Sequence, residues 1–588
     1  MRNFVRLIRT LFKFYPVKVP VQIFLLFFCA AINTAPSVFI QKIIAVIELS
    51  DSGTSWQEVS SQVFGLLAIL GGFYALSLLG AIANGQLGAE VTQGVLMRLR
   101  CQMFSRMQNL PLQFFDSNSH GDIMSRYTND VDSLRQMVSQ AMPQMLIALT
   151  TVTAILGIML YFSLWLTLVT LAGIAVMFVV TKKVGGRSAR NFRAQQKFTG
   201  KLEGYAEEIM NGQKVVKVFC REEECTAGFE RLNTELFTEA EKANKRANTL
   251  GPILNNIGNI LYVITALAGG VLILAGVPNV SISGLPMSIS VAIPFLNMTK
   301  QFAMNINQLS MQLNAIVLGL AGTGRIFALV DAEPEEDEGR AEAPDGGSIE
   351  FDGVDFAYTE GVPVLKSITL TARPGQKTAL VGSTGAGKTT IANLIPRFYD
   401  VRAGSILYDG QDIRTFRKAS LRRKLGIVLQ DTNLFTGTVL ENIRYGNLEA
   451  SDEDCIEAAK LAGADEFITR LPEGYSTMLA GNGANLSQGQ RQLIAIARAA
   501  VANPEVMIMD EATSSIDTRT EALVQRGMDA LMKGRTVFVI AHRLSTVRDS
   551  DLILVMEHGE IIERGTHSEL MAQKGQYYRL YTGAFELS

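Results

Sequence analysis

The chain has 588 residues, of which 48% are hydrophobic and only 19% charged, with a formal net charge of -2 at pH 7. The length predicts two or more domains, the composition is typical of a chain with membrane-spanning segments, and the near-zero charge argues against a nucleic-acid partner. The five cysteines show no paired spacing, so we expect neither a disulfide framework nor a zinc site.

The first predicted element is a short basic amphipathic helix over residues 2–13. Its basic side chains, interleaved with apolar ones at helical spacing, are Arg2, Arg6, Arg9 and Lys13. We expect this helix to lie on the anionic cytoplasmic leaflet of a membrane. A disordered basic tail is the alternative. No cleavable signal peptide is recognisable before Lys18.

Six apolar stretches follow, each long enough to cross about 30 Å of hydrocarbon. They lie at roughly 19–47, 61–85, 139–160, 165–181, 252–277 and 284–312. The third and fourth nearly touch and are expected to form a tight hairpin. Basic residues gather between spans two and three and after span four, whereas the short loops carry no Lys or Arg; Lys42 is an exception to this trend. The positive-inside bias therefore predicts a multi-pass protein of the cytoplasmic (inner) membrane with both termini in the cytoplasm.

The two connections on the basic side, residues 86–138 and 182–251, are unusually long. They are polar, contain little proline and keep helical periodicity, so we expect helices that project well beyond the bilayer. An inserted globular domain is the alternative.

The sixth predicted span carries carboxamides along one helical face. They recur at steps of 4, 4, 3 and 4 residues and are Asn297, Gln301, Asn305, Gln308 and Gln312. Contact with lipid would be costly, so this face must meet protein or water. Two roles stay open: hydrogen bonds between helices, or the lining of a pathway for a bulky amphipathic substrate. Lys300 is the one charge in this span, and its partner cannot be identified from the sequence.

An acidic segment rich in Pro and Gly, residues 331–347, is interpreted as a solvated linker between a membrane domain at 1–330 and a second domain at 348–588. The second domain alternates strand-like and helix-like segments, as an α/β fold does. Thr378–Gly382 is a strand that leads into a Gly-rich loop, and a helix follows it. In this setting the pattern G-x-x-x-x-G-K-T is a phosphate-binding loop, whose backbone N–H groups and helix N-terminus attract phosphates.

The residues of this loop expected to bind nucleotide are Gly382, Ser383, Thr384, Gly385, Ala386, Gly387, Lys388, Thr389 and Thr390. Lys388 is expected to reach the β- and γ-phosphates, and Thr389 to place a hydroxyl on Mg²⁺. The apolar run at 506–509 is interpreted as a buried parallel strand that ends in Asp510 and Glu511. Asp510 is expected to hold the Mg²⁺ shell, and Glu511 to polarise the attacking water as the catalytic carboxylate. An ordinary strand with an acidic helix cap is the alternative.

The segment Leu-Ser-Gln-Gly-Gln-Arg-Gln at 486–492 resembles the L-S-G-G-Q signature of ATP-binding-cassette transporters, and the whole chain resembles an exporter half-transporter of that family. The resemblance implies a multidomain membrane protein: a six-helix transmembrane domain with long cytoplasmic helical extensions, followed by an α/β phosphate-loop nucleotide-binding domain. It also implies ATP and Mg²⁺ as cofactors.

The resemblance further assigns roles to matching positions. It implies that Tyr358 stacks on adenine, that Gln430 contacts Mg²⁺ and water, that Asp517 communicates between two cassettes, and that His542 contacts the γ-phosphate. It implies that the signature residues serve the ATP held by a second subunit; they are Ser487, Gln488, Gly489 and Gln490. Residues 111–132 resemble the first coupling region, which passes cassette motion to the spans.

Two departures from the family pattern bear on the partner. Gln488 stands where many members have Gly, and Gly481 stands where many have Glu. Since Glu511 and His542 are retained, this combination favours a heterodimer with a second half-transporter subunit over a homodimer. The missing Glu leaves in doubt how signature movement couples to the spans.

The sequence therefore predicts ATP-driven export or flipping of hydrophobic or amphipathic compounds, drugs or lipids, by alternating access. An importer of a siderophore-like ligand with exporter architecture is one alternative. A soluble-type cassette ATPase with a membrane anchor, or an inactive regulatory or channel-forming cassette, would place the chain in a different class.

Overall fold

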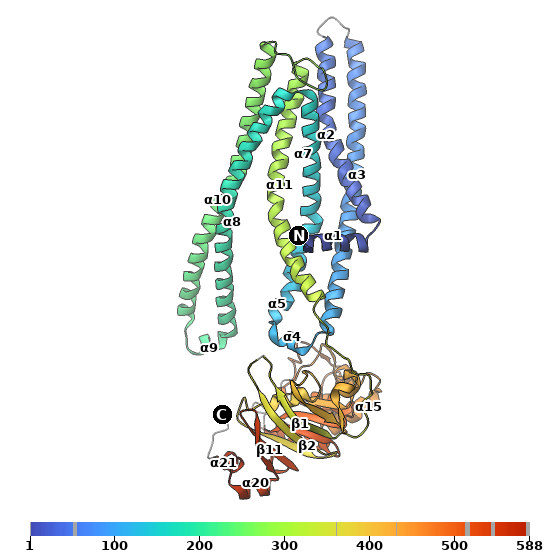
Figure 1. Ribbon diagram of the computed structural model, residues 1–588, viewed down its shortest axis with the longest axis vertical. Coiled ribbons are helices and arrows are strands. Elements are labelled where there is room, and N and C mark those ends of the chain that lie inside the picture. The colour runs from blue at the N-terminus through green and yellow to red at the C-terminus, as the bar shows by residue number, and fades with distance from the viewer. Residues whose placement is uncertain are drawn as a thin grey trace. The chain divides into compact units, whose positions relative to one another are not determined.

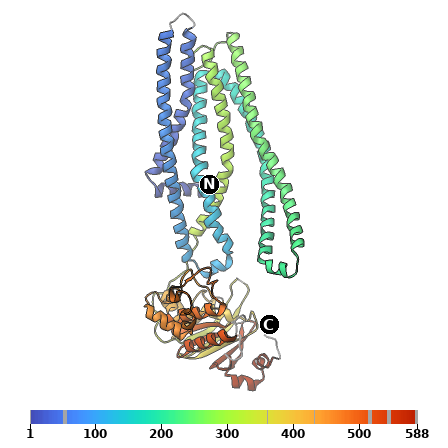
Figure 2. The same ribbon diagram turned by 180° about the vertical axis from the view of Figure 1, so that it is seen from behind.

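The computed structural model describes residues 2–50, 56–359, 361–430, 432–511, 518–541 and 547–583 (Figures 1 and 2). The chain divides into two compact units. The first comprises Met1–Gln108 and Asn118–Ala332, and the second comprises Asn109–Ser117 and Glu333–Ser588. The short stretch Asn109–Ser117 thus belongs to the unit whose remaining residues come more than 200 positions later in the chain.

The first unit is helical. Its helices are α1 (Arg2–Phe14), α2 (Lys18–Ser50), α3 (Trp56–Gln108), α5 (His120–Ser125), α6 (Val131–Gln136), α7 (Met142–Phe162), α8 (Leu164–Asn211), α9 (Gln213–Val218), α10 (Glu222–Leu274) and α11 (Ile289–Val330). Two π-helical turns, η1 (Arg126–Asp130) and η2 (Met137–Ala141), interrupt the region between α5 and α7. Figures 1 and 2 show α8 and α10 side by side as a long antiparallel pair joined by α9, with α2 and α3 forming a second such pair.

Five of the predicted spans coincide with helices that are long and apolar enough to cross a membrane. Among the described residues these are Lys18–Glu48, Val59–Gln108, His120–Phe162, Leu164–Lys183 and Gly251–Leu274. The hairpin between the third and fourth is as tight as predicted, because only Ser163, in an extended conformation, separates α7 from α8.

The sixth predicted span falls on α11, in which the described residues Ala315–Val330 form a shorter apolar stretch. The helix begins at Ile289 instead of residue 284, since Ser288 is extended and Gly284 has a φ of 67°. That α11 crosses the membrane stays a prediction, which its position beside α7 and α10 favours.

The long polar connections are helical, as predicted, and the described residues contain no inserted globular domain there. The helices α8 and α10 have 48 and 53 residues and continue from the apolar spans without a break. They are joined through α9, with short breaks at Gly212 and at Phe219–Arg221.

The second unit is an α/β domain. Its strands are β1 (Ile349–Phe356), β2 (Leu365–Ala372), β3 (Lys377–Gly382), β4 (Ala403–Tyr408), β5 (Gln411–Asp412), β6 (Leu425–Val428), β7 (Gly437–Thr438), β8 (Met478–Leu479), β9 (Val506–Glu511), β10 (Thr536–Ala541), β11 (Leu552–Glu557) and β12 (Glu560–Gly565). Its helices are α4 (Leu112–Ser117), α12 (Lys388–Leu394), α13 (Lys418–Arg423), α14 (Val439–Arg444), α15 (Asp452–Leu461), α16 (Asp465–Ile468), α17 (Gln488–Val501), α18 (Thr518–Met532), α20 (His567–Gln573) and α21 (Gln576–Tyr581).

A six-stranded sheet in the order β12-β11-β3-β10-β9-β6 forms the centre of this domain, and only β12 runs antiparallel to its neighbour. Successive residues of β9 alternate between two hydrophobic cores: Met507 and Met509 face one, Val506 and Ile508 the other. Both faces of the sheet are therefore covered, which explains why residues 506–509 form a continuous apolar run, as predicted for a buried parallel strand.

Part of the predicted linker is packed against the second unit instead of lying free in solvent. The Glu335 carboxylate accepts hydrogen bonds from Arg422 Nη1 at 3.0 Å and from Lys418 Nζ at 3.1 Å. The Ala343 side chain is buried, and its N–H donates to Ser420 Oγ at 2.8 Å. Residues 333–347 accordingly belong to the second unit.

Candidate functional site

The phosphate-binding loop lies between β3 and α12, where the strand–loop–helix pattern placed it. Gly382, Gly385 and Gly387 have φ values of 152°, 82° and 101°, in or near the left-handed region that favours glycine. A Cβ on Gly387 would come within 2.6 Å of Leu365 Cδ2, whereas a Cβ on Gly385 would meet nothing within 4 Å. The loop therefore packs closely against Leu365 at Gly387 and is open at Gly385, as a backbone site for phosphates requires.

Lys388, the first residue of α12, is buried and points back along the loop. Its Nζ donates hydrogen bonds to the backbone oxygens of Gly382 at 2.7 Å and Ser383 at 2.8 Å. Burial lowers the pKa of the Lys388 ammonium, and the nearby Asp510 carboxylate opposes that shift. Two carbonyl oxygens thus hold the only cation of the loop in place.

Parallel strands bring the other predicted nucleotide residues to the edge that carries the loop. Strands β3, β10, β9 and β6 are neighbours, so the residues at their carboxyl ends share one edge of the sheet. Asp510 lies in β9 opposite Ile540 of β10, which is opposite Leu380 of β3. Gln430 follows the end of β6 and is exposed.

Three predicted residues are described less fully. The backbone of Glu511 is the last residue of β9, directly after Asp510, but its side chain lies outside the described residues. Asp517 and His542 also lie outside the described residues; His542 follows Ala541, the last residue of β10, in the sequence. Strands β9 and β10, which end at Glu511 and Ala541, reach the same edge of the sheet as the phosphate loop.

Tyr358 belongs to an aromatic cluster beside α12. Its ring centroid lies 4.8 Å from that of Phe356 and 5.0 Å from that of Tyr399, and its hydroxyl donates to Thr390 Oγ1 at 3.3 Å. The ring stays 39% exposed, so it offers a free face for stacking. Tyr399 in turn donates a hydrogen bond to Asp116 of α4, and burial, followed by this carboxylate, raises the pKa of Tyr399.

The signature segment forms the N-terminus of α17. Ser487 caps the helix: its hydroxyl accepts from Gln490 N at 3.3 Å, and Gln490 Oε1 accepts from Ser487 N at 2.9 Å. Gly489 is buried and Gln488 is half-buried. Gly481, where the family often has Glu, has a φ of 52°, a backbone conformation that disfavours a side chain such as Glu.

In the first unit, the structure separates the carboxamides of α11 into two groups. Gln308 and Gln312 both donate from Nε2 to Gln144 Oε1 of α7, at 2.7 and 2.6 Å. Asn305 donates to the backbone oxygen of Gln301 at 2.8 Å within α11. Asn297, the first member of the stripe, is exposed. Two of the five predicted residues therefore connect helices.

Lys300 lies beside a small cavity of about 30 Å³ between α10 and α11. Three carboxamide residues line the cavity with it: Asn255, Asn259 and Asn307. Among the described residues, no carboxylate forms an ion pair with Lys300. The cavity thus gathers a cation and amide groups at one point between α10 and α11.

Sequence reasoning missed several of these contacts. Gln144 is a polar residue inside the third predicted span, and that signal could have identified it as a partner for the stripe. The Tyr399–Asp116 bond joins residues 283 positions apart, and Asp130 pairs with Arg325 of α11 at 2.7 Å across 195 positions. No local sequence pattern predicts either pair.

Comparison with known proteins agrees with this arrangement. The family model of the ABC transporter transmembrane region matches residues 19–294, and that of the ABC transporter domain matches residues 365–514. The ABC transporter ATP-binding protein YfiC of Bacillus subtilis is 43% identical over 499 residues, which are 84% of this chain and 81% of the relative. The fatty acid ABC transporter ATP-binding/permease protein of Mycobacterium tuberculosis is 40% identical over 515 residues, 87% of this chain and 80% of the relative.

Two further relatives extend the comparison. The ATP-dependent lipid A-core flippase of Syntrophus aciditrophicus is 38% identical over 501 residues, 84% of this chain and 81% of the relative. A solved structure of a bacterial Atm1-family ABC exporter with ATP bound superimposes with a TM-score of 0.78 at 29% identity and covers 97% of this chain and 99% of that one. The chain therefore belongs to the ATP-binding-cassette transporter family, as a multi-pass exporter half-transporter of the inner membrane whose ATPase domain takes ATP together with Mg²⁺.

Proposed function

We propose that the chain exports lipid-like amphiphiles with an anionic headgroup, of which a long-chain fatty acid is the simplest, and that both of its termini are cytoplasmic. The observation that carries the headgroup assignment is the cavity beside Lys300. The names of two relatives, a fatty acid transporter and a lipid A-core flippase, support a lipid as substrate. Drugs and other amphipathic compounds are the wider class.

The cavity beside Lys300 has the donors that a carboxylate needs. An ammonium group and the amides of Asn255 and Asn259 can all donate to one anion, and the cavity is about the size of a single small group. Asn255 and Asn259 lie within the first three turns of the apolar stretch Gly251–Leu274, close to the polar extension of α10. An unpaired lysine inside a span is costly, which favours a functional role for Lys300.

The nucleotide site supplies the energy for this transport. Lys388 and the loop amides would hold the ATP phosphates, Tyr358 would stack on the base, and Thr389, Gln430 and Asp510 would hold Mg²⁺. When Mg²⁺ is bound, it neutralises the negative charge that develops on the ATP phosphates during hydrolysis. Glu511 would accept a proton from the attacking water, and His542 would contact the γ-phosphate.

A second subunit completes the transporter, and we favour a heterodimer over a homodimer. The altered signature residue Gln488 would serve the partner's ATP, where Asp517 would also communicate between cassettes, while Glu511 and His542 keep this chain's own site complete. The end of α9 supports the need for a partner, because Val215, Val218 and Phe219 are 60%, 76% and 68% exposed. Alternating access would then follow from ATP-driven closure of the two cassettes.

Import of a siderophore-like ligand is the second direction that this architecture permits, and it differs in the side from which substrate is taken. Polar residues such as Lys300 and Gln144 inside the spans argue against a soluble-type cassette ATPase with a membrane anchor. An anchor has no pathway to line, so the cost of these residues would have no function to offset it.

The test compares a long-chain fatty acid with its uncharged methyl ester in proteoliposomes. We expect the acid to stimulate ATP hydrolysis and to be moved away from the cassette side, and the ester to act weakly. Lys300→Gln should abolish the preference for the acid, whereas Lys42→Gln, a lysine of α2, should retain it. Equal stimulation by acid and ester in the unaltered protein would refute the headgroup assignment, and uptake toward the cassette side would refute export.

The partner is tested by the purified chain alone. Robust, cooperative ATP hydrolysis would indicate a homodimer and contradict the heterodimer proposal. Little hydrolysis alone, restored by adding a second half-transporter subunit, is the expected result.

A further inference from the structure

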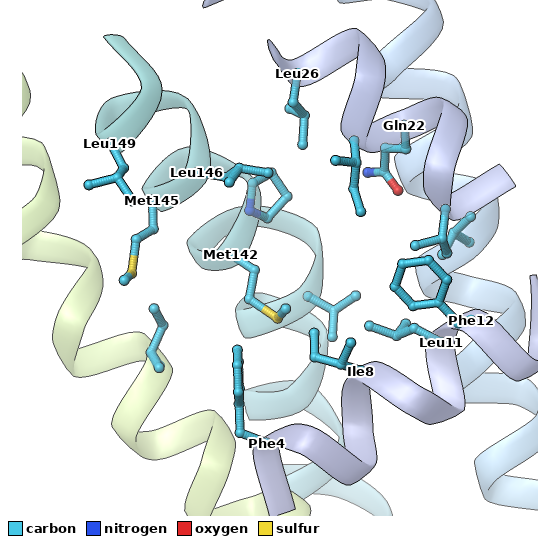
Figure 3. A pocket seen from close by; sticks show the side chains of 16 residues that line it. Phe4, Ile8, Leu11, Phe12, Gln22, Leu26, Met142, Met145, Leu146 and Leu149 are labelled. Carbon is cyan, nitrogen blue, oxygen red and sulfur yellow. The ribbon is translucent and has the colours of Figure 1, made fainter. Parts of the chain in front are cut away.

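An apolar cavity of about 350 Å³ lies in the first unit, mainly between α1, α2 and α7, and Val91 of α3, Val138 of η2 and Ile316 of α11 complete its lining. Figure 3 shows Phe4, Ile8 and Leu11 of α1 and Met142 and Leu146 of α7 pointing into the same space. Gln22 of α2 is the one polar residue of the lining. The volume lies within the range of small-molecule sites, about 300–1,000 Å³.

A second face of α1, which adjoins the lining at Phe12, is basic and solvent-accessible. Arg2, Arg9 and Lys13 are exposed, and among the described residues no carboxylate pairs with any of them. Arg6, in contrast, donates to Asp331 Oδ1 at 2.7 Å and its guanidinium lies 4.1 Å from the Phe327 ring centroid, so α1 is fixed against α11. The amphipathic helix α1 thus carries part of the cavity lining on one face and, beside it, cations for which the described residues provide no ion pair.

We infer that this cavity holds one acyl chain of an anionic phospholipid from the leaflet in which α1 lies, and that Arg9 and Lys13 hold its phosphate. Arg9 lies three residues before Phe12 of the lining and Lys13 directly follows it, so a lipid whose tail enters the cavity beside Phe12 has its headgroup near both cations. Apolar lining, open access and flanking cations match an anionic amphiphile in both of its parts. An uncharged apolar ligand would offer no anionic group for Arg9 and Lys13 to bind.

This occupant is distinct from the proposed substrate, because the cavity shares no lining residue with the cavity beside Lys300, and α11 contributes to it only Ile316, one turn after Gln312. Met142, Met145, Leu146 and Leu149 recur at helical spacing on the face toward the cavity. Gln144 lies about half a turn away and bonds α11. A bound tail would therefore pack against one face of α7, while Gln144 on another face bonds α11. We accordingly assign the lipid a structural and activating role.

The test uses the full-length protein in phosphatidylcholine nanodiscs with a trace of phosphatidylglycerol that carries a photoreactive diazirine midway along one acyl chain. After illumination and digestion, we expect crosslinks within residues 4–12 and 142–149. Leu146→Trp fills the cavity and should reduce this labelling several-fold, while Leu168→Trp, at a 51% exposed leucine of α8, should not. Ile8→Phe is a second, smaller filling change, and size-exclusion chromatography with circular dichroism checks that each variant is folded.

The charge assignment has its own readout. The double variant Arg9→Gln, Lys13→Gln should lower the preference for the phosphatidylglycerol probe over the matching phosphatidylcholine probe about 30-fold, since each of the two basic residues near an anionic lipid contributes about 1 kcal/mol. An unchanged preference would overturn the headgroup contact. Labelling spread evenly over exposed positions such as Phe24 and Leu78 would overturn the site as ordinary lipid contact. Loss of the crosslink in excess fatty acid would refute the assignment of a phospholipid to this cavity and would indicate that the cavity is part of the substrate route.

Discussion

The hydrogen bonds from α11 to Gln144 predict a measurable energetic coupling between α7 and α11. Gln144→Leu removes one acceptor and with it two bonds, from Gln308 at 2.7 Å and Gln312 at 2.6 Å. Side-chain hydrogen bonds between membrane helices contribute about 0.6 kcal/mol on average and at most about 1.7 kcal/mol each. We therefore expect the free energy of unfolding to fall by about 1–3 kcal/mol.

A double-mutant cycle isolates this coupling. Unfolding of Gln144→Leu, Gln308→Leu and the double variant is followed in lipid–detergent micelles by loss of helical circular dichroism, and the pair should show a coupling energy of about 0.6 kcal/mol or more. Gln301→Leu is the matched control, because its side chain makes no described contact with Gln144 and should be additive. Additivity of the Gln144 and Gln308 changes within about 0.3 kcal/mol would refute the coupling. A changed substrate preference with unchanged stability would instead support a lining role for Gln308.

Three further changes test the nucleotide domain. Glu511→Gln should slow ATP hydrolysis about 100-fold or more while ATP binding, measured by equilibrium dialysis, is retained; unchanged hydrolysis would contradict the assigned base. Gly387→Ala should abolish nucleotide binding, because its Cβ would lie 2.6 Å from a β2 leucine at a φ of 101°, and normal binding would show that the loop can move. Burial favours a raised pKa for Glu335, but hydrogen bonds from Arg422 and Lys418 outweigh it and hold the pKa below its ordinary 4.5. The stabilisation by Glu335 is therefore present above pH 4.5 and is lost as the pH falls below it, and Glu335→Gln should flatten acid unfolding in that range.

The helices of the first unit could be predicted because apolar length and charge placement are local signals. The π-helical turns η1 and η2 could not, since an extra residue in a helical turn leaves no mark on the pattern. They lie where this segment meets α11: Asp130, the last residue of η1, bonds Arg325 at 2.7 and 2.8 Å, and Met137 of η2 lies where Gly319 has no side chain. Tertiary contacts, not local preference, account for this part of the fold.

The shape of the sheet edge beside the phosphate loop was predictable for a similar reason. Asp510 and Gln430 lie at or just after the carboxyl ends of β9 and β6, and parallel strands place such residues at one edge regardless of the intervening sequence. The bond from Tyr399 to Asp116 depends instead on how α4, which comes early in the chain, packs on the later domain. A pair of residues 283 positions apart has no shared pattern that sequence reasoning could use.

The stripe on α11 shows how one sequence pattern can serve two purposes. Its steps of three and four residues predicted a single face, and the sequence left hydrogen bonding and pathway lining as alternatives. In the structure, Gln308 and Gln312 hydrogen-bond to Gln144 of α7. Asn297 is exposed, and Lys300 borders a polar cavity between α10 and α11. If α11 is anchored at one part and lined with polar groups at the other, a substrate that displaces groups near Lys300 acts on a helix already fixed to α7. Substrate binding would then bias the packing of α7 and α11 together, which is the kind of two-state element that coupling to the ATPase domain requires.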